Sequence, residues 1–186
     1  MESVQAACLS SIFIYPIKSC RGIEVSQAAL TPVGLRWDRN WLIVNSNGRG
    51  YTQRVEAKLA LVEVNLPIEA FSLSWQPATN SFMVINAPGM SALKVPLTTP
   101  REVIHGVSVW EWSGSALDEG EQAADWFTNY IGKPSRLVRF NGCAPSNKPL
   151  HYRIHSNFPQ LLIPEWLILV THNIIQYSLP TCFLIC

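Results

Sequence analysis

The sequence is poor in charged residues, and neither sign of charge is in excess. Asp, Glu, Lys and Arg make up 15% of its 186 residues and leave a net charge of +1, whereas a typical domain has about 25% charged residues. Without a basic or acidic excess, the chain offers no broad electrostatic surface for nucleic acid or for an anionic membrane. The hydrophobic content of 48% argues against intrinsic disorder and favours a buried, β-rich protein.

The sequence also lacks a cysteine framework, a targeting segment and a long apolar run. The five cysteines are Cys8, Cys20, Cys143, Cys182 and Cys186. Their number is odd and none form a C-x-x-C pair, so we expect no disulfide framework, no zinc site and a reducing compartment. The first basic residue is Lys18, which does not fit a signal or transit peptide and predicts a cytoplasmic protein. No uninterrupted run reaches the roughly 18 apolar residues of a membrane span.

What the sequence does contain is a succession of short apolar or alternating segments, separated by turn signals. The seven Trp and thirteen Pro suit short strands and turns better than long helices. We predict strands at residues 8–15, 24–30, 41–44, 59–66, 71–75, 82–85, 93–97, 102–105, 107–112 and 137–140. The dipeptide Asn47-Gly48 predicts a hairpin turn. Strands at this spacing indicate a barrel or a sandwich, so we predict an α+β, mainly β domain with a barrel-like antiparallel sheet.

One helix is predicted at about residues 119–131. Asp118 is a candidate N-cap, and Glu121 completes a pattern like a capping box. The apolar positions recur at helical spacing and predict a face packed on the sheet; they are Ala123, Trp126, Phe127, Tyr130 and Ile131. Gly132 and Pro134 end the helix.

The character of the sequence changes after residue 140. Residues 141–186 contain only three charged side chains, Lys148, Arg153 and Glu165, and show neither helical nor strand periodicity. We therefore divide the chain into a β-rich domain at residues 1–140 and a poorly specified apolar tail at residues 141–186. An exposed tail of this composition would promote aggregation.

The strongest candidate for a site follows the first strand. After Pro16 the chain carries Lys18, Ser19, Cys20 and Arg21, and Gly22 lets it turn into the next strand. Further basic residues at or near strand ends are Arg36, Arg39, Arg49 and Arg54. If the fold brings several of these together with Lys18 and Ser19, they form a phosphate or carboxylate site. The alternative is scattered surface charge, paired with Glu24, Asp38 and Glu56.

Two weaker hypotheses concern other side chains. Cys20 has a lowered pKa if Lys18 and Arg21 surround it, and is an inert thiol if it is buried. His151 and His155 are four residues apart and could share a helix face, but without a carboxylate or thiol partner a solvated loop is the alternative to a metal site. The sequence contains no GxGxxG motif, no P-loop and no Ser-His-Asp arrangement with supporting spacing.

Residues 14–22 (IYPIKSCRG) resemble the start of the N-terminal β-barrel domain that precedes a MOSC domain. MOSC domains occur in mitochondrial amidoxime-reducing components and at the C-terminus of molybdenum cofactor sulfurases. The resemblance continues in order through residues 34–36 (GLR), 38–41 (DRNW), Gly48, 52–54 (TQR), 59–61 (LAL), Gly114, 123–124 (AA), Trp126, Gly132 and 136–138 (RLV). It covers roughly residues 8–140, and the ordered series is more specific than any single motif in it.

The resemblance implies a protein that binds the molybdenum cofactor (molybdopterin), a pterin dithiolene that carries a phosphate and the metal. Family members reduce N-hydroxylated substrates with electrons from a partner protein chain, or handle the sulfur of the cofactor. By resemblance, Lys18, Ser19 and Arg39 contact the polar and phosphate parts of the cofactor, with Arg54 as a further candidate. The family also suggests pyridoxal phosphate binding, and a mitochondrial address as the alternative to a cytoplasmic one.

The family pattern is not met after residue 140. A MOSC domain with an Arg-Pro-Asn segment and a cysteine that ligates molybdenum is expected there. Residues 156–163 (SNFPQLLI) only faintly resemble its start, and Cys182 and Cys186 lack the expected surroundings. We therefore predict a divergent or truncated remnant at residues 141–186, no metal ligand, and an N-terminal part of a molybdenum-cofactor oxidoreductase that is inactive alone. The alternatives are a non-catalytic module that pairs with a full-length relative, and a non-functional truncated isoform.

Overall fold

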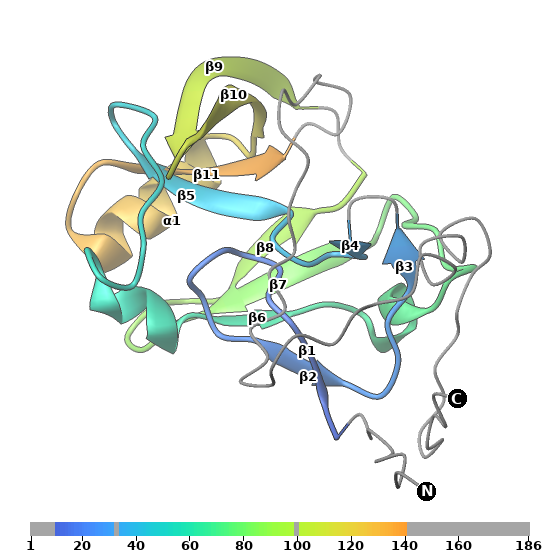
Figure 1. Ribbon diagram of the computed structural model, residues 1–186. Helices are drawn as coiled ribbons and strands as arrows, with labels where there is room; N and C mark the ends of the chain where they lie inside the picture. The colour runs from blue at the N-terminus through green and yellow to red at the C-terminus, as the bar shows by residue number, and fades with distance from the viewer. Residues whose placement is uncertain (1–9, 32–33, 99–100, 141–186) are drawn as a thin grey trace, which may run out of the picture.

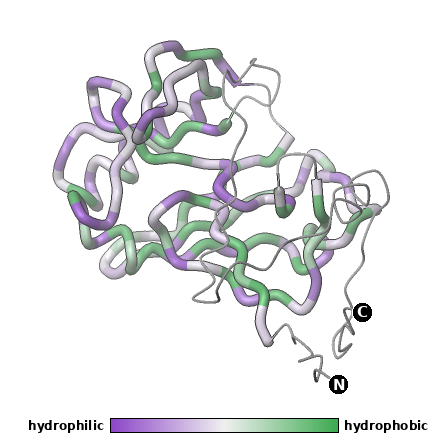
Figure 2. The backbone as a smooth tube through the Cα atoms, viewed as in Figure 1, coloured by the Kyte–Doolittle hydropathy of each residue, from purple (hydrophilic) through white to green (hydrophobic). Residues whose placement is uncertain are grey.

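The computed structural model describes residues 10–31, 34–98 and 101–140. Within these residues the fold consists of antiparallel strands and one α-helix, with apolar segments along the strands and hydrophilic turns between them (Figures 1 and 2). The strands are β1 (Ile12–Ile14), β2 (Ile23–Val25), β3 (Leu30–Thr31), β4 (Gly34–Leu35), β5 (Trp41–Asn45), β6 (Glu63–Asn65), β7 (Phe82–Asn86), β8 (Leu93–Pro96), β9 (Glu102–Val109), β10 (Trp112–Asp118) and β11 (Ser135–Phe140). The helices are the α-helix α1 (Glu121–Ile131) and the 3-10 helices η1 (Ala57–Leu61) and η2 (Ile68–Phe71).

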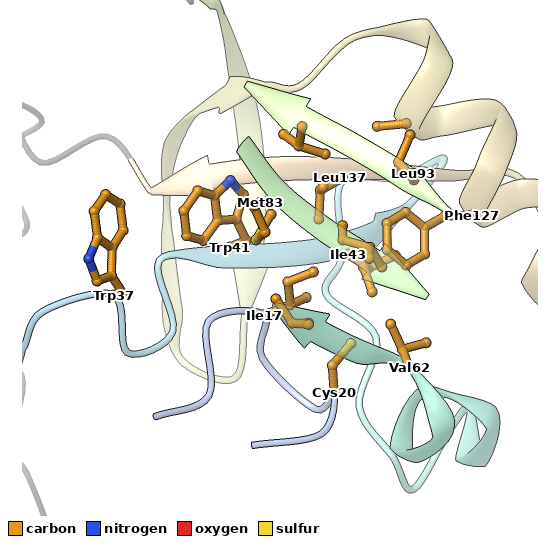
Figure 3. Packing of buried hydrophobic residues seen from close by; sticks show 14 of the residues in the cluster. Ile17, Cys20, Trp37, Trp41, Ile43, Val62, Met83, Leu93, Phe127 and Leu137 are labelled. Atoms are coloured by element: carbon orange, nitrogen blue, oxygen red, sulfur yellow. The ribbon is translucent and has the colours of Figure 1, made fainter. Parts of the chain in front are cut away.

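The largest described sheet has four strands in the order β5-β11-β10-β9. A three-stranded sheet has the order β6-β7-β8, and β1-β2 and β3-β4 form two-stranded sheets. The core lies where the two larger sheets, α1 and the turn after β1 meet; it includes Ile17, Ile43, Met83, Phe127 and Leu137, each at most 1% exposed (Figure 3). Burial of these large side chains supplies the main stabilisation of the fold.

The predicted fold class, α+β and mainly β with one packed helix, is confirmed. The sheets do not close into a barrel, however, and the barrel-like part of the prediction is corrected to separate antiparallel sheets. Closure requires a continuous ladder from the first strand to the last, and in the described residues the ladders stop where 3-10 turns and irregular segments intervene. No helix in these ranges is long and apolar enough to cross a membrane.

Several sequence predictions match observed elements. The segments at 41–44, 82–85, 93–97 and 137–140 correspond to β5, β7, β8 and β11. The Asn47-Gly48 turn is also confirmed: the Gly48 N–H donates to the Asn45 carbonyl over 2.9 Å, and Gly48 has φ of +72°. Glycine suits this conformation because it has no Cβ.

Two predicted strands are wrong. Residues 59–66 form η1 followed by the short β6, because Leu59 and Val62, both 0% exposed, are buried three residues apart, which is the period of a 3-10 helix. Residues 71–75 leave η2 as an irregular segment. There the Ser72 carbonyl accepts from the Arg36 guanidinium over 3.2 Å instead of joining a ladder.

The strands at the far edge also differ from the prediction. The segments at 102–105 and 107–109 belong to the single strand β9, which continues through Gly106 at φ of +78°. The predicted strand 107–112 is therefore too long: residues 110 and 111 form a hairpin loop, and Trp112 begins β10. The strand β10 was missed because Ser113, Gly114 and Ser115 hide its period-two pattern. It forms nevertheless because β9 and β11 hydrogen-bond to it on both sides.

The helix begins later than predicted. Its N-cap is Gly120, without a side-chain cap, so capping by Asp118 is wrong. Asp118 ends β10, where one carboxylate oxygen accepts from the Gly120 N–H over 2.9 Å and the other from Arg136 Nε over 2.7 Å. The predicted apolar face and the end at Gly132, in the left-handed conformation, are confirmed.

A buried carboxylate joins the elements around α1. The Glu119 side chain is 0% exposed and bonds the guanidinium groups of both Arg101 and Arg139. Its Oε1 accepts from Arg139 Nε over 2.7 Å and from the Trp41 indole N–H over 2.6 Å. Arg101 and Arg139 also donate to the Pro96 carbonyl. This cluster therefore ties β5, β8 and β11 to the segment that precedes the helix.

We predict that Glu119→Ala lowers the free energy of unfolding by about 3–5 kcal/mol, because it leaves two guanidinium groups buried without their shared carboxylate. Urea denaturation followed by circular dichroism measures the change. The matched control is Glu63→Ala, which removes the exposed ion pair with Arg21 and should cost less than about 1 kcal/mol. Equal losses in the two variants would contradict a special role for the buried cluster.

Candidate anion-binding site

The site is built on two backbone segments that run side by side. The Trp41 N–H donates to the Pro16 carbonyl over 3.0 Å, and the Lys18 N–H donates to the Trp41 carbonyl over 2.8 Å. The Arg39 N–H donates to the Tyr15 carbonyl over 2.7 Å. Pro16 ends the ladder of β1 because it has no N–H, but its carbonyl still accepts. These bonds fix the backbones of Lys18 and Arg39 next to each other on a rigid base.

The backbone turns sharply at two residues of the site, Ser19 and Arg39. Ser19 has φ of +71° and Arg39 has φ of +54°, values that non-glycine residues seldom adopt. Gln53 Nε2 donates to the Ser19 carbonyl over 2.9 Å. This bond attaches the loop that carries Arg54 to the turn that carries Lys18 and Ser19.

Three cations gather at this point, and we call Lys18, Arg39 and Arg54 the cation cluster. Lys18 Nζ lies 5.3 Å and Arg54 Cζ 5.8 Å from the centroid of the Trp110 ring. Arg39 Cζ lies 5.4 Å from the centroid of the Tyr15 ring, and its charge acts on Lys18. The structure thus brings Lys18, Arg39 and Arg54 of the predicted site residues together, and Ser19 follows Lys18 in the same turn. Their role in binding stays a prediction.

The electrostatics of the cluster favour an anion. Burial lowers the pKa of Lys18 from its ordinary value, and the nearby charge of Arg39 lowers it further. Arg39 pairs with Asp38, whose side chain is 3% exposed and also accepts from the Tyr15 N–H over 2.9 Å. No acidic side chain within the described ranges pairs with Lys18 or Arg54. The cluster therefore keeps an excess of positive charge that a phosphate, sulfate or carboxylate group could neutralise.

The other basic candidates make different contacts. Arg36 stacks on Trp37 and Trp75, with centroid distances of 5.1 and 5.8 Å, and serves the packing of that region. Arg49 lies in the hairpin turn, where its backbone N–H donates to the Asn45 side chain. Position near strand ends did not distinguish these two arginines from Arg39 and Arg54, whereas the family resemblance selected only Arg39 and Arg54.

The alternative of paired surface charge holds only in part. Asp38 does pair with a cation of the cluster, through Arg39. Glu56 instead pairs with Lys133 over 3.2 Å, and Glu24 accepts from the Ser11 hydroxyl over 3.2 Å.

Cys20 is not a reactive thiol of this site. Its side chain points into the core and is 1% exposed (Figure 3). Burial raises its pKa to about 12, so the hypothesis of a lowered pKa is wrong and the inert alternative is confirmed. The neighbouring charge does not compensate, since Arg21 extends outward to pair with Glu63 over 2.6 Å.

The metal hypothesis cannot be placed on the structure. His151 and His155 lie outside the described residues, as do Cys182 and Cys186. Among the residues that are described, no group of three or more His, Cys, Asp or Glu side chains could hold a metal ion.

Three residues of the site were missed or misread in the sequence. Tyr15 supports Arg39 through its ring. We expected Gly22 to permit a turn. Its role is instead to leave space for the Tyr15 ring, because a Cβ at this position would lie 2.8 Å from that ring. Trp110 contacts two cations from the loop between β9 and β10. The sequence contained no signal for this loop, because it has neither glycine nor asparagine and residues 107–112 have the pattern of one strand.

Comparison with known proteins identifies the family of the chain. A family model described as the MOSC N-terminal beta barrel domain matches residues 6–134. Mitochondrial amidoxime reducing component 2 of Rattus norvegicus is 33% identical over 143 residues, which cover 74% of this chain and 39% of the relative. The human protein of the same name is 30% identical over 170 residues, covering 87% of this chain and 47% of the relative. Molybdenum cofactor sulfurase of Danio rerio is 34% identical over 131 residues, which cover 70% of this chain and 15% of the relative.

The chain thus spans less than half the length of each of these relatives. The matched region contains every residue of the cation cluster and both backbone segments that position it. On the extent of the family match, the chain belongs to the family of proteins that carry the MOSC N-terminal β-barrel domain.

Proposed function

We propose that this chain supplies the anion-binding part of a molybdenum-cofactor site, in which Lys18, Ser19, Arg39 and Arg54 hold the phosphate of the cofactor. The observation that carries the proposal is the cation cluster: three cations converge, and no described carboxylate pairs with Lys18 or Arg54. The donor set fits the group, since phosphate is bound by guanidinium forks, ammonium groups and hydroxyls. The relatives named for this cofactor and for amidoxime reduction give the chemical class.

Each side chain has a distinct task in this proposal. Lys18 supplies a point charge from a half-buried position, where weaker solvent screening strengthens its attraction to an anion. Arg39 supplies a planar fork that Asp38 and the Tyr15 ring hold in orientation. Ser19 offers a hydroxyl from a turn with positive φ, and Arg54 adds an exposed guanidinium. The bound cofactor would supply the redox chemistry at its metal, while these residues bind and orient it.

The wider role follows from the relatives. We propose that the chain acts within the oxidoreductase or cofactor-sulfur chemistry of this family, is inactive alone, and receives electrons from a partner protein chain or pairs with a full-length relative. We favour a mitochondrial location, because the amidoxime reducing components are mitochondrial by name. Pyridoxal phosphate binding stays a prediction, supported by no residue of the described site.

The proposal is tested by the molybdenum and pterin content of the purified 186-residue chain. We expect cofactor in the wild type and a loss of at least about tenfold in Lys18→Ala and in Arg39→Ala, since each change removes a charge-assisted contact. Lys133→Ala is the matched control, because it removes a lysine that pairs with Glu56 away from the cluster. Absence of cofactor in the wild type would contradict binding by this chain alone.

The site should also show a characteristic pH dependence. Anion binding requires charged Lys18, and its lowered pKa means that it loses its proton at a lower pH than a free lysine. Affinity for sulfate, a dianion throughout this range, should therefore be retained below that pKa and fall as the pH rises through it. Lys18→Arg should flatten this dependence, because a guanidinium stays charged. Isothermal titration of the wild type and of Lys18→Arg with sulfate, from neutral to alkaline pH, measures the effect. Identical pH profiles would exclude Lys18 as the titrating group.

A further inference from the structure

Trp110 is a large aromatic side chain left in solvent beside the cation cluster. It occupies the two-residue loop between Val109, the last residue of β9, and Trp112, the first of β10. It is 69% exposed, the second most exposed large hydrophobic residue in the described part of the chain. Its neighbour Trp112 instead packs against Phe140, with ring centroids 5.8 Å apart. A role in the core therefore explains Trp112 but not Trp110.

The backbone at Trp110 is strained. Its φ of +54° lies in the left-handed region, at a loop position that normally takes glycine or asparagine. Four non-glycine residues in the described ranges have positive φ; they are Ser19, Trp37, Arg39 and Trp110. Three of these four belong to the site or touch it. Strain of this kind persists only where the surroundings enforce it, and it gathers at ligand-binding positions.

The indole also links two separate segments of the cluster. Lys18 comes from the turn after β1 and Arg54 from the loop before η1, and both lie over the Trp110 ring, at 5.3 and 5.8 Å from its centroid. Attraction between the cations and the π-face holds the ring against the anion site. Because most of the side chain remains exposed, there is accessible aromatic surface directly beside the position of the anion.

We infer that Trp110 is a stacking platform that positions the planar heteroaromatic ring of the ligand whose anionic group the cation cluster holds. The inference rests on the proposed function and adds a recognition element to it. Cations alone accept any phosphate or carboxylate, whereas an indole face adds free energy only for ligands that carry a flat ring. The ligand class is therefore an anionic molecule with a flat heterocyclic ring, and the pterin of the proposed cofactor is the member of this class that we test.

Two probes separate the anion site from the ring site: 6-carboxypterin, which carries both features, and sulfate, which has no ring. We expect Trp110→Gly to weaken 6-carboxypterin binding by roughly tenfold, the scale of one lost aromatic stack, and to weaken sulfate binding clearly less, because sulfate has no ring to stack. Trp110→Phe, which keeps an aromatic face, should stay within about threefold of the wild type for both probes. Lys18→Ala should weaken both probes. The control Ile68→Ala removes another exposed apolar side chain, 79% exposed on η2, and should change neither.

Thermal unfolding distinguishes positioning from a structural role. Glycine adopts positive φ without steric penalty, so the midpoint of Trp110→Gly should not fall. A sharp fall in midpoint, or an equal loss of both probes, would overturn the inference and leave the anion site standing. If the wild type binds sulfate tightly and shows no preference for 6-carboxypterin, the stacking role of Trp110 would also be overturned, and the anion site would still stand. Binding of neither probe by the wild type would contradict the proposed function as well.

Discussion

The site depends on a carboxylate that lies away from the cation cluster. Glu119 is fully buried and accepts the indole N–H of Trp41, while Arg139 stacks on the same indole at 5.0 Å. The backbone of Trp41 in turn bonds Pro16 and Lys18. A chain of contacts thus runs from the buried ion cluster through one tryptophan to the turn that carries the candidate ligand-binding residues. Because each link is buried or hydrogen-bonded, the cations are held on a rigid base instead of a mobile loop.

Stability and binding place opposite demands on the loops around the cluster. Ser19, Arg39 and Trp110 hold positive φ values, which glycine would adopt with less strain, and Lys18 and Arg39 lie close enough to repel each other. Both features lower the stability of the free protein. Both also suit a site that gains free energy when an anion neutralises the charge, since the binding conformation is then formed in advance. The aromatic rings of Tyr15 and Trp110 offset part of the repulsion.

The relatives place this region within longer proteins. The matched segment is 39% and 47% of the length of two amidoxime reducing components and 15% of a molybdenum cofactor sulfurase. Proteins with different names thus share this region of sequence. The described residues offer positioning and charge, which are the contributions a protein makes when a cofactor carries the chemistry.

The sequence by itself determined the mainly β class, the helix that ends at Gly132 and the hairpin at Gly48. It also identified the candidate site residues Lys18, Ser19, Arg39 and Arg54. These features could be predicted because turn residues, periodicity and ordered motifs are local signals. It misjudged residues 59–66, 71–75 and the start of α1, where burial against distant elements overrides alternation and capping. Only the tertiary structure showed that Cys20 is buried and brought Trp110 to Lys18 and Arg54. These outcomes depend on contacts between segments far apart in the chain, and no local pattern encodes which distant side chain will lie beside a given residue.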